Sequence, residues 1–192
     1  GIGWTFEAEV VIPNHNKCVV NILSSKYEPP KDYTVHLAVS PTKMNDRYEW
    51  FLEKATEIGV TFITPIITHN SERKVVKTER FEKIIQSAMK QSLNSYLPTL
   101  GAAVTFSEFI KTHHKGNNFI AHCALGEKLK LKDQIKPGTS ITILIGPEGD
   151  FSPQEIASAI ENDYTPVSLG NSRLRTETAA IVACHTIQLC NE

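Results

Sequence analysis

Strand-like and helix-like segments alternate along most of this chain, and this alternation limits its possible folds more than any other feature. From residue 33 onward, short β-branched runs such as SITILIG (140–146) are each followed by segments with apolar residues every three or four positions. Parallel strands need helical crossovers of this kind, whereas antiparallel strands can be joined by tight turns. The sequence therefore predicts an α/β domain with a largely parallel sheet.

End signals place several of these elements. Gly59 should end the first helix, and SPQE (152–155) combines a serine cap, a first-turn proline and a capping-box glutamate. Asp46 and Glu49 also have capping-box spacing, and Thr78 can cap the second helix. The expected strands are 33–40, 60–68, 118–125, 140–146 and 166–169, and the expected helices are 46–58, one from 78 that ends before 98, 107–113, one from 152, and one from about 176 to the end. Pro65 suggests that its strand lies at a sheet edge or carries a bulge.

The first residues follow a different pattern. GIGWTFEAEVVI (1–12) alternates as a half-buried strand should, and CVVNIL (18–23) is the returning strand after a turn at 14–17. A two-stranded hairpin is marginal alone in water, so we expect either further strands before it or support from the rest of the chain. Two prolines and mixed charges near 26–33 are typical of a linker.

Composition and missing motifs exclude several function classes. Hydrophobic content of 41% and charged content of 21% are those of a soluble globular protein. No apolar run approaches the roughly 18 residues that span a bilayer, and no signal peptide opens the chain, so we expect a cytoplasmic protein without a membrane partner. The chain contains no dinucleotide-binding, P-loop or nucleophile-elbow motif. The four cysteines lack zinc-like spacing and no metalloprotease or EF-hand pattern occurs, so we expect no metal.

Two glycine-containing loops follow expected strands, at the edge where open α/β sheets bind ligands. In IGPEGD (145–150) the glycines allow the backbone to approach a ligand closely, but a strand-to-helix turn that simply needs glycines is an equal alternative. In SLGNSRLRTET (168–178), Arg173 and Arg175 stand beside a helix start, which favours an anion. Glu177 could instead neutralise Arg175 in a structural ion pair.

A basic segment follows the second of the expected strands. Lys and Arg outnumber Glu in ERKVVKTERFEKIIQSAMK (72–90), although the formal net charge of the whole chain is only −1. A solvated helix face is the simpler interpretation of such a run. The average charge gives no general reason to expect a polyanionic partner.

Read as a pair, the two loops resemble a known family. ILIGPEGDFSPQEI (143–156) and SLGNSRLRTETAA (168–180) look like the signature motifs of the RsmE family, bacterial methyltransferases that modify uridine N3 of 16S ribosomal RNA within the SPOUT superfamily. The stretch at 46–73, ending in Ser-Glu-Arg, and SAMKQSLNSYLP (87–98) also resemble family segments. GIGWTFEAEV (1–10) resembles the closing strands of the family's N-terminal PUA-like barrel.

This resemblance implies an organisation and partners. It implies a knotted α/β SPOUT-type methyltransferase domain over 30–192, with a C-terminal trefoil knot, preceded over 1–29 by a remnant of a PUA-like RNA-binding β-barrel. It also implies S-adenosyl-L-methionine as methyl donor, a homodimer, and 16S rRNA of the small ribosomal subunit as substrate. Another SPOUT enzyme with a different RNA target, or a non-catalytic RNA-binding or assembly protein of the same fold, stays open as an alternative.

Site residues follow from the resemblance position by position. Arg175 would stabilise negative charge that develops on the uracil ring, and Glu177 would orient that arginine or act as a base. The family usually has an arginine one position away from Arg173, so Arg175 is the preferred functional residue. The implied donor-binding residues are Ala124, Leu125, Gly126, Ile145, Gly146, Pro147, Glu148, Gly149, Leu169, Gly170 and Leu174. The implied RNA-binding residues are Asn70, Ser71, Arg73, Lys74, Gln91 and Arg173.

Overall fold

The computed structural model describes residues 1–112 and 114–192 and confirms the α/β class predicted from the alternating pattern. Every pairing within its large sheet is parallel. The strands lie in the order β5-β4-β3-β9-β7-β10-β8, and β6 also pairs with β4. Their bounds are β3 (Val35–Val39), β4 (Phe62–Ile67), β5 (Thr99–Leu100), β6 (Val104–Thr105), β7 (Asn117–Ala121), β8 (Leu129–Lys130), β9 (Ile141–Ile145) and β10 (Tyr164–Ser168).

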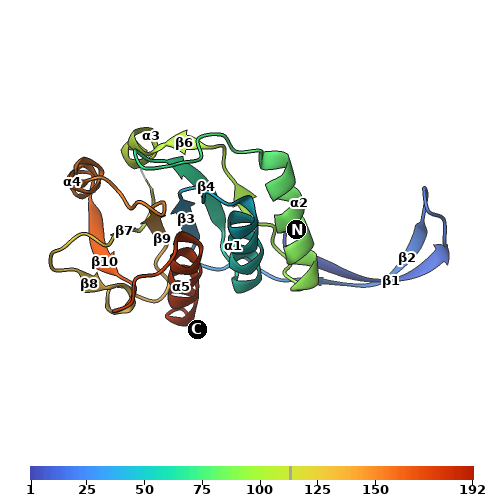
Figure 1. Ribbon diagram of the computed structural model, residues 1–192. Helices are drawn as coiled ribbons and strands as arrows, with labels where there is room; N and C mark the ends of the chain where they lie inside the picture. The colour runs from blue at the N-terminus through green and yellow to red at the C-terminus, as the bar shows by residue number, and fades with distance from the viewer. Residues whose placement is uncertain (113) are drawn as a thin grey trace.

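Helices cover both faces of this sheet (Figure 1). On one face α1 (Asn45–Ile58), α2 (Thr78–Gln91) and α5 (Thr176–Leu189) enclose a core that includes Phe51, Ile143 and Ala180. On the other face α3 (Phe106–Lys111) and α4 (Pro153–Glu161) enclose a smaller core around Leu144 and Phe109. A short 3₁₀ turn, η1 (Leu131–Asp133), follows β8. Strand β9 is buried on both faces, which explains why its sequence is apolar except at Thr142.

The ends of the helices test the capping predictions. The Ser152 box is confirmed: the Ser152 hydroxyl accepts from the Glu155 amide at 3.2 Å, and the Glu155 carboxylate accepts from the Ser152 amide at 2.8 Å. The predicted caps at Asp46 and Thr78 are wrong, because both residues already lie inside their helices, after Met44 and Lys77. A capping side chain must stand just outside the helix to reach the first free amides.

Other details of the secondary structure also differ from expectation. Pro65 lies on the interior strand β4 and not on an edge strand. On one side of β4, Phe62 and Ile63 pair with β5, and Ile66 and Ile67 pair with β6, so Pro65 falls between the two paired stretches. No strand partner is paired with Pro65 on that side, so its missing N–H is tolerated. The predicted helix 107–113 is α3, which ends at Lys111, and its predicted last residue, His113, lies outside the described residues. Within residues 1–112 and 114–192, no helix combines the length and apolarity needed to cross a membrane.

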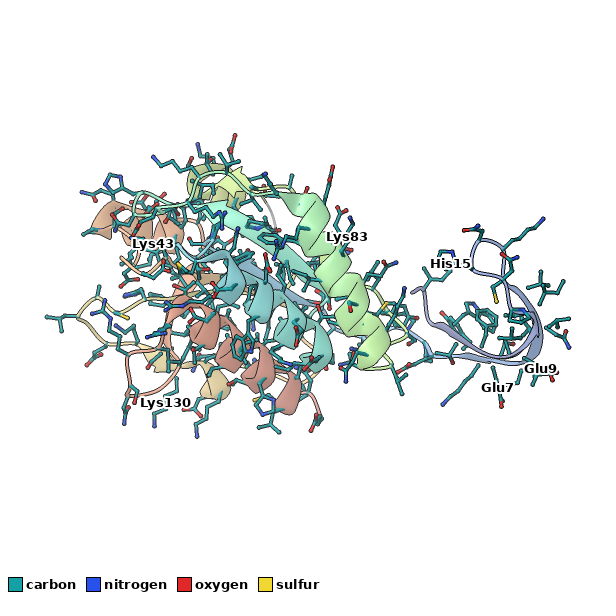
Figure 2. The ribbon with its side chains drawn as sticks, turned by 45° about the vertical axis from the view of Figure 1, so that its right-hand side comes forward. Glu7, Glu9, His15, Lys43, Lys83 and Lys130 are labelled. Atoms are coloured by element: carbon teal, nitrogen blue, oxygen red, sulfur yellow. The ribbon has the colours of Figure 1, made fainter. Side chains whose placement is uncertain are left out.

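The predicted N-terminal hairpin consists of β1 (Trp4–Ile12) and β2 (Val19–Tyr27), paired antiparallel. It projects from the domain in both views, with Glu7, Glu9 and His15 on its far part (Figure 2). Only its base is tied down: the Gly3 amide donates to Ser95 O at 3.0 Å, and the Ser95 hydroxyl donates to Glu28 Oε2 at 2.6 Å. Every residue of both strands is exposed, so the hairpin contributes nothing to the core.

Candidate functional site

A cavity of about 670 Å³ lies where β7, β9 and β10 end and α5 begins. Both glycine loops contribute to it, and this position agrees with the rule that open α/β sheets bind ligands at the carboxyl ends of their strands. Its lining residues are Ala121, His122, Cys123, Lys128, Ile145, Gly146, Pro147, Glu148, Asp150, Val167, Ser168, Leu169, Gly170, Asn171, Ser172, Arg173, Leu174, Arg175, Thr176 and Ala179. A cavity of this volume is typical of a small-molecule site.

The loop between β9 and α4 is held from several sides. The buried Thr176 hydroxyl donates to Gly146 O at 2.9 Å, which joins the loop to the start of α5. The Lys43 amide donates to Glu148 Oε1 at 3.1 Å, which joins it to the segment after β3. Because side chains and amides from distant segments converge on it, this loop is preorganised before any ligand arrives.

The glycines of this loop have a packing reason of their own. A Cβ at Gly146 would lie 3.1 Å from the Phe151 ring, and one at Gly149 would lie 3.2 Å from Cβ of Asn70. The Asn70 amide nitrogen donates to Gly149 O at 3.1 Å and to Asp150 O at 3.0 Å. Both glycines are thus required by packing, and Gly146 also lines the cavity, whereas Gly149 lies outside the cavity lining.

The second loop brings Arg173, Leu174 and Arg175 to the cavity, and both arginines are exposed. Within the described part of the chain, Arg175 has no carboxylate partner within 4.0 Å, so the alternative of a structural pair with Glu177 is wrong. Residues two positions apart at a helix start point to different sides, which explains the missing contact. The guanidinium of Arg175 is thus available to an anionic group in the cavity.

Glu177 instead faces α1. Its side chain is nearly buried, and Oε1 lies 4.0 Å from Nε of Arg47. Its other oxygen, Oε2, is buried without a hydrogen-bond partner among the described residues. Sequence reasoning missed Arg47, and no signal pointed to it, because contact between α1 and α5 is a tertiary feature.

The implied donor-binding residues after β7 do not line the cavity. Ala124, Leu125 and Gly126 lie outside the cavity lining, whereas the preceding segment 121–123 lines it. Leu125 is fully exposed, so the chain has turned away from the cavity by that position. His122 contributes a ring whose two nitrogens are buried without partners among the described residues, and burial followed by the charge of Lys128 lowers its pKa.

The predicted RNA-binding residues differ in how far their side chains already form contacts within the protein. The Ser71 side chain is buried and accepts from the Thr68 amide at 2.9 Å, and Asn70 holds the β9–α4 loop, so both support the fold locally. Arg73 is partly exposed, donating to Asn45 Oδ1 and to Val75 O. The side chains of Lys74, Gln91 and Arg173 are exposed, as is that of Asn70 despite its hydrogen bonds to the β9–α4 loop.

Apart from residue 113, which is not described, no cluster of three or more His, Cys, Asp or Glu side chains has an arrangement that could hold a metal ion.

Comparisons with known proteins identify the class of protein to which this chain belongs. Residues 29–188 match the RNA methyltransferase domain. A ribosomal RNA small subunit methyltransferase E from Rickettsia conorii is 30% identical over 98% of this chain and 78% of its own length. The chain therefore belongs to the RNA methyltransferase family that includes ribosomal RNA small subunit methyltransferase E, as the resemblance of its two loops predicted.

Solved structures agree with this assignment. A probable rRNA-methyltransferase from Porphyromonas gingivalis is 39% identical with a TM-score of 0.89, covering 98% of this chain and 82% of that chain. A ribosomal RNA small subunit methyltransferase E from Neisseria gonorrhoeae, bound to S-adenosyl methionine, is 28% identical with a TM-score of 0.86, covering 100% of this chain and 81% of that chain.

Proposed function

We propose that this protein transfers the methyl group of S-adenosyl-L-methionine to N3 of a specific uridine in 16S rRNA of the small ribosomal subunit. The observation that carries this proposal is the cavity that both signature loops build, with Arg175 at its wall and no carboxylate of the described residues within 4.0 Å of that guanidinium. The family of the chain and the donor bound to the Neisseria relative support the same chemistry.

The residues of the cavity suit the proposed donor. Ile145, Leu169 and Leu174 offer apolar surface to an adenine ring, and the glycines admit close approach of main-chain groups. The carboxylates of Glu148 and Asp150 bring negative charge toward a ligand that carries an ammonium and a sulfonium group. Bound S-adenosyl-L-methionine supplies the methyl group as an electrophilic carbon attached to its sulfonium sulfur.

Arg175 has the role that the acceptor chemistry demands. Uridine N3 is a poor nucleophile while protonated, with a pKa roughly two units above neutrality, so the site must favour the anion. A guanidinium next to O2 or O4 stabilises the charge that develops as N3 loses its proton. Arg175 provides this group from the first residue before α5. Methyl transfer otherwise depends mainly on alignment, which the tied loops supply.

Glu177 takes a positioning role in this proposal. Its contact with Arg47 joins the start of α5 to α1, and α5 begins directly after Arg175. We infer that this contact fixes the backbone from which the catalytic guanidinium extends.

The basic segment before and within α2 is the proposed RNA surface. Lys74 is exposed beyond β4, and Lys83 lies on the outer side of α2 (Figure 2). The segment follows β4 at the same sheet edge as the cavity, so a phosphate backbone lying on it would place a base near Arg175. Gln91 and Arg173 are the other exposed candidates for this surface.

A lysine substitution tests this surface. Lys74→Ala should weaken binding to the small-subunit RNA and lower the slope of log affinity against log salt by about 0.7–0.9, since one phosphate contact is lost. Lys136→Ala is a matched control, because this exposed lysine lies in the loop before the amino end of β9. Affinity would be measured in a salt series with free 16S rRNA fragments and small subunits. Equal slopes for Lys74→Ala and the unchanged protein would place the RNA elsewhere.

The function itself is tested by RNA analysis. Small-subunit rRNA from a strain lacking the gene should lose one 3-methyluridine in mass spectrometry, and the purified protein with donor should restore it. Retention of 3-methyluridine with loss of another methylated base would favour a different SPOUT target. Absence of S-adenosylhomocysteine binding in calorimetry, with all methylated bases retained, would favour a non-catalytic RNA-binding or assembly protein.

The organisation of the chain forms part of the same proposal. We infer that 1–29 is a remnant of a PUA-like RNA-binding barrel, because the hairpin exposes large apolar side chains, and barrel closure would bury those on its inward face. Residues 30–192 form the methyltransferase domain, for which we propose a C-terminal trefoil knot, a homodimer and a cytoplasmic location. Light scattering tests the dimer, a backbone trace in a crystal structure tests the knot and the barrel, and cell fractionation tests the location.

A further inference from the structure

Asp150 has an unusual backbone conformation for a residue with a side chain. Its φ of 63° lies in the left-handed region, which side chains rarely adopt and which Asp and Asn tolerate better than most. Its main chain is fixed there on both sides: its amide donates to Pro147 O at 2.9 Å, and its carbonyl accepts from Asn70 at 3.0 Å. Non-glycine residues persist in such conformations when their surroundings require them, often at functional sites.

The carboxylate of Asp150 connects two walls of the cavity. Oδ2 accepts from the Cys123 amide at 2.8 Å, and Oδ1 accepts from the Phe151 amide at 2.9 Å. Asp150 belongs to the β9–α4 loop, whereas Cys123 follows β7, so the first of these bonds crosses from one wall to the other. Hydrogen bonds to an ionised carboxylate are shorter and stronger than those between neutral groups.

The segment held in this way directly precedes Ala124, Leu125 and Gly126, the donor-binding residues that the resemblance implies. Residues 121–123 line the cavity, and beyond Cys123 the chain turns outward to the fully exposed Leu125. No regular strand pairing holds Cys123, because β7 ends at Ala121. The Asp150 carboxylate therefore supplies the contact that keeps this end of the wall, with the unpartnered ring of His122, against the cavity.

We propose that Asp150 is a positioning residue for the methyl donor: its carboxylate holds the main chain of Cys123, and with it the segment 121–123, at the spacing that S-adenosyl-L-methionine requires. This inference rests on the proposed function, since that function names the ligand. In this proposal, Asp150 adopts the left-handed conformation because that conformation directs its carboxylate toward Cys123 rather than toward solvent.

Glycine substitution separates this role from a contribution to folding. Asp150→Gly removes the carboxylate but suits the left-handed backbone, so the apparent melting temperature without ligand should stay level or rise. Affinity for S-adenosylhomocysteine should nevertheless fall about tenfold, and KM for the donor should rise more than kcat falls. Asp150→Asn keeps an acceptor oxygen and tolerates the same backbone, so it should stay within about threefold of the unchanged protein.

Asp163 provides the matched control. It has nearly the same φ, 64°, but lies between α4 and β10 and does not line the donor cavity. Asp163→Gly should therefore relieve the same kind of backbone strain and leave the affinity for S-adenosylhomocysteine unchanged. In amide exchange by NMR, the Cys123 N–H should exchange faster in Asp150→Gly and not in Asp163→Gly.

The outcomes are separable. If the unchanged protein binds no S-adenosylhomocysteine, the proposed function fails. The exchange rates of the Cys123 amide still report whether its hydrogen bond to Asp150 exists. If the unchanged protein binds and Asp150→Gly binds equally well, the positioning role is overturned. If Asp150→Gly proves unstable, equal affinity of Asp150→Asn and Asp150→Ala at a temperature where both are folded overturns it instead.

Discussion

Replacing Arg175 with alanine should lower kcat/KM for RNA methylation by roughly 100- to 1,000-fold, the usual cost of deleting a group that stabilises developing negative charge. Affinity for S-adenosylhomocysteine should change little, because the guanidinium serves the acceptor base rather than the donor. The loss should appear in kcat, since the charge exists only as N3 loses its proton. Single-turnover methylation of small subunits, followed by mass spectrometry, measures this rate directly.

Arg173→Ala is the matched control for this substitution. Both arginines line the cavity and are exposed, so both variants remove one positive charge from the same loop. Arg173→Ala should raise KM for RNA and leave kcat close to that of the unchanged protein. Arg175→Lys should recover part of the rate, because it keeps the charge but not the planar fork. Equal kcat losses in the two alanine variants would contradict a specific role for Arg175.

Acid should destabilise the fold through His36, with an expected loss of about 3 kcal/mol between pH 6.5 and 4. Burial, followed by the neighbouring His114, lowers the pKa of His36 from 6.5 to about 4. Its Nε2 lies 2.8 Å from the Thr64 hydroxyl, and the rings of Phe62, Phe109 and His114 surround it. The unfolded chain takes up a proton below pH 6.5 whereas the folded protein does not, so stability is complete above that pH and falls as pH decreases toward 4.

Urea unfolding from pH 7.5 to 4, with and without His36→Gln, measures this contribution. Glutamine keeps a hydrogen-bonding group near Thr64 but does not titrate, so the difference in unfolding free energy between the two proteins should narrow as pH falls. His15→Asn, on the exposed hairpin, should leave the pH dependence unchanged. Parallel curves for His36→Gln and the unchanged protein would show that the histidine does not titrate across folding.

Local features of the chain were predictable because their causes are local. The Ser152 capping box depends on residues three positions apart, and Gly59 ends α1 in a left-handed conformation, as its sequence position predicted. The helices that begin at Asn45 and Thr78 were also predicted, but their caps were placed at the wrong residues, since a cap can shift by one or two residues without changing the apolar pattern. The capping box at Thr105 was overlooked although its spacing was present.

Contacts between distant segments were not predictable. Glu177 meets Arg47 rather than Arg175, because the packing of α5 on α1 brings together residues far apart in the sequence. Ser71 and Asn70 were assigned to RNA, but the turn after β4 and the β9–α4 loop use their polar atoms. A resemblance transfers residue identities from one family member to another. It does not show whether the polar atoms of those residues already form hydrogen bonds within the protein.

The sequence by itself determined the α/β class, the parallel sheet, the positions of the two glycine loops and the family, since periodicity and contiguous motifs are written along the chain. Only the tertiary structure decided that the two loops share one cavity, that Glu177 contacts Arg47 rather than Arg175, and that Asp150 holds Cys123 across the cavity wall. The physical reason is that hydrogen bonds and ion pairs depend on distances of a few ångströms between side chains. Those distances follow from how helices and strands pack, and packing is not encoded at any single position.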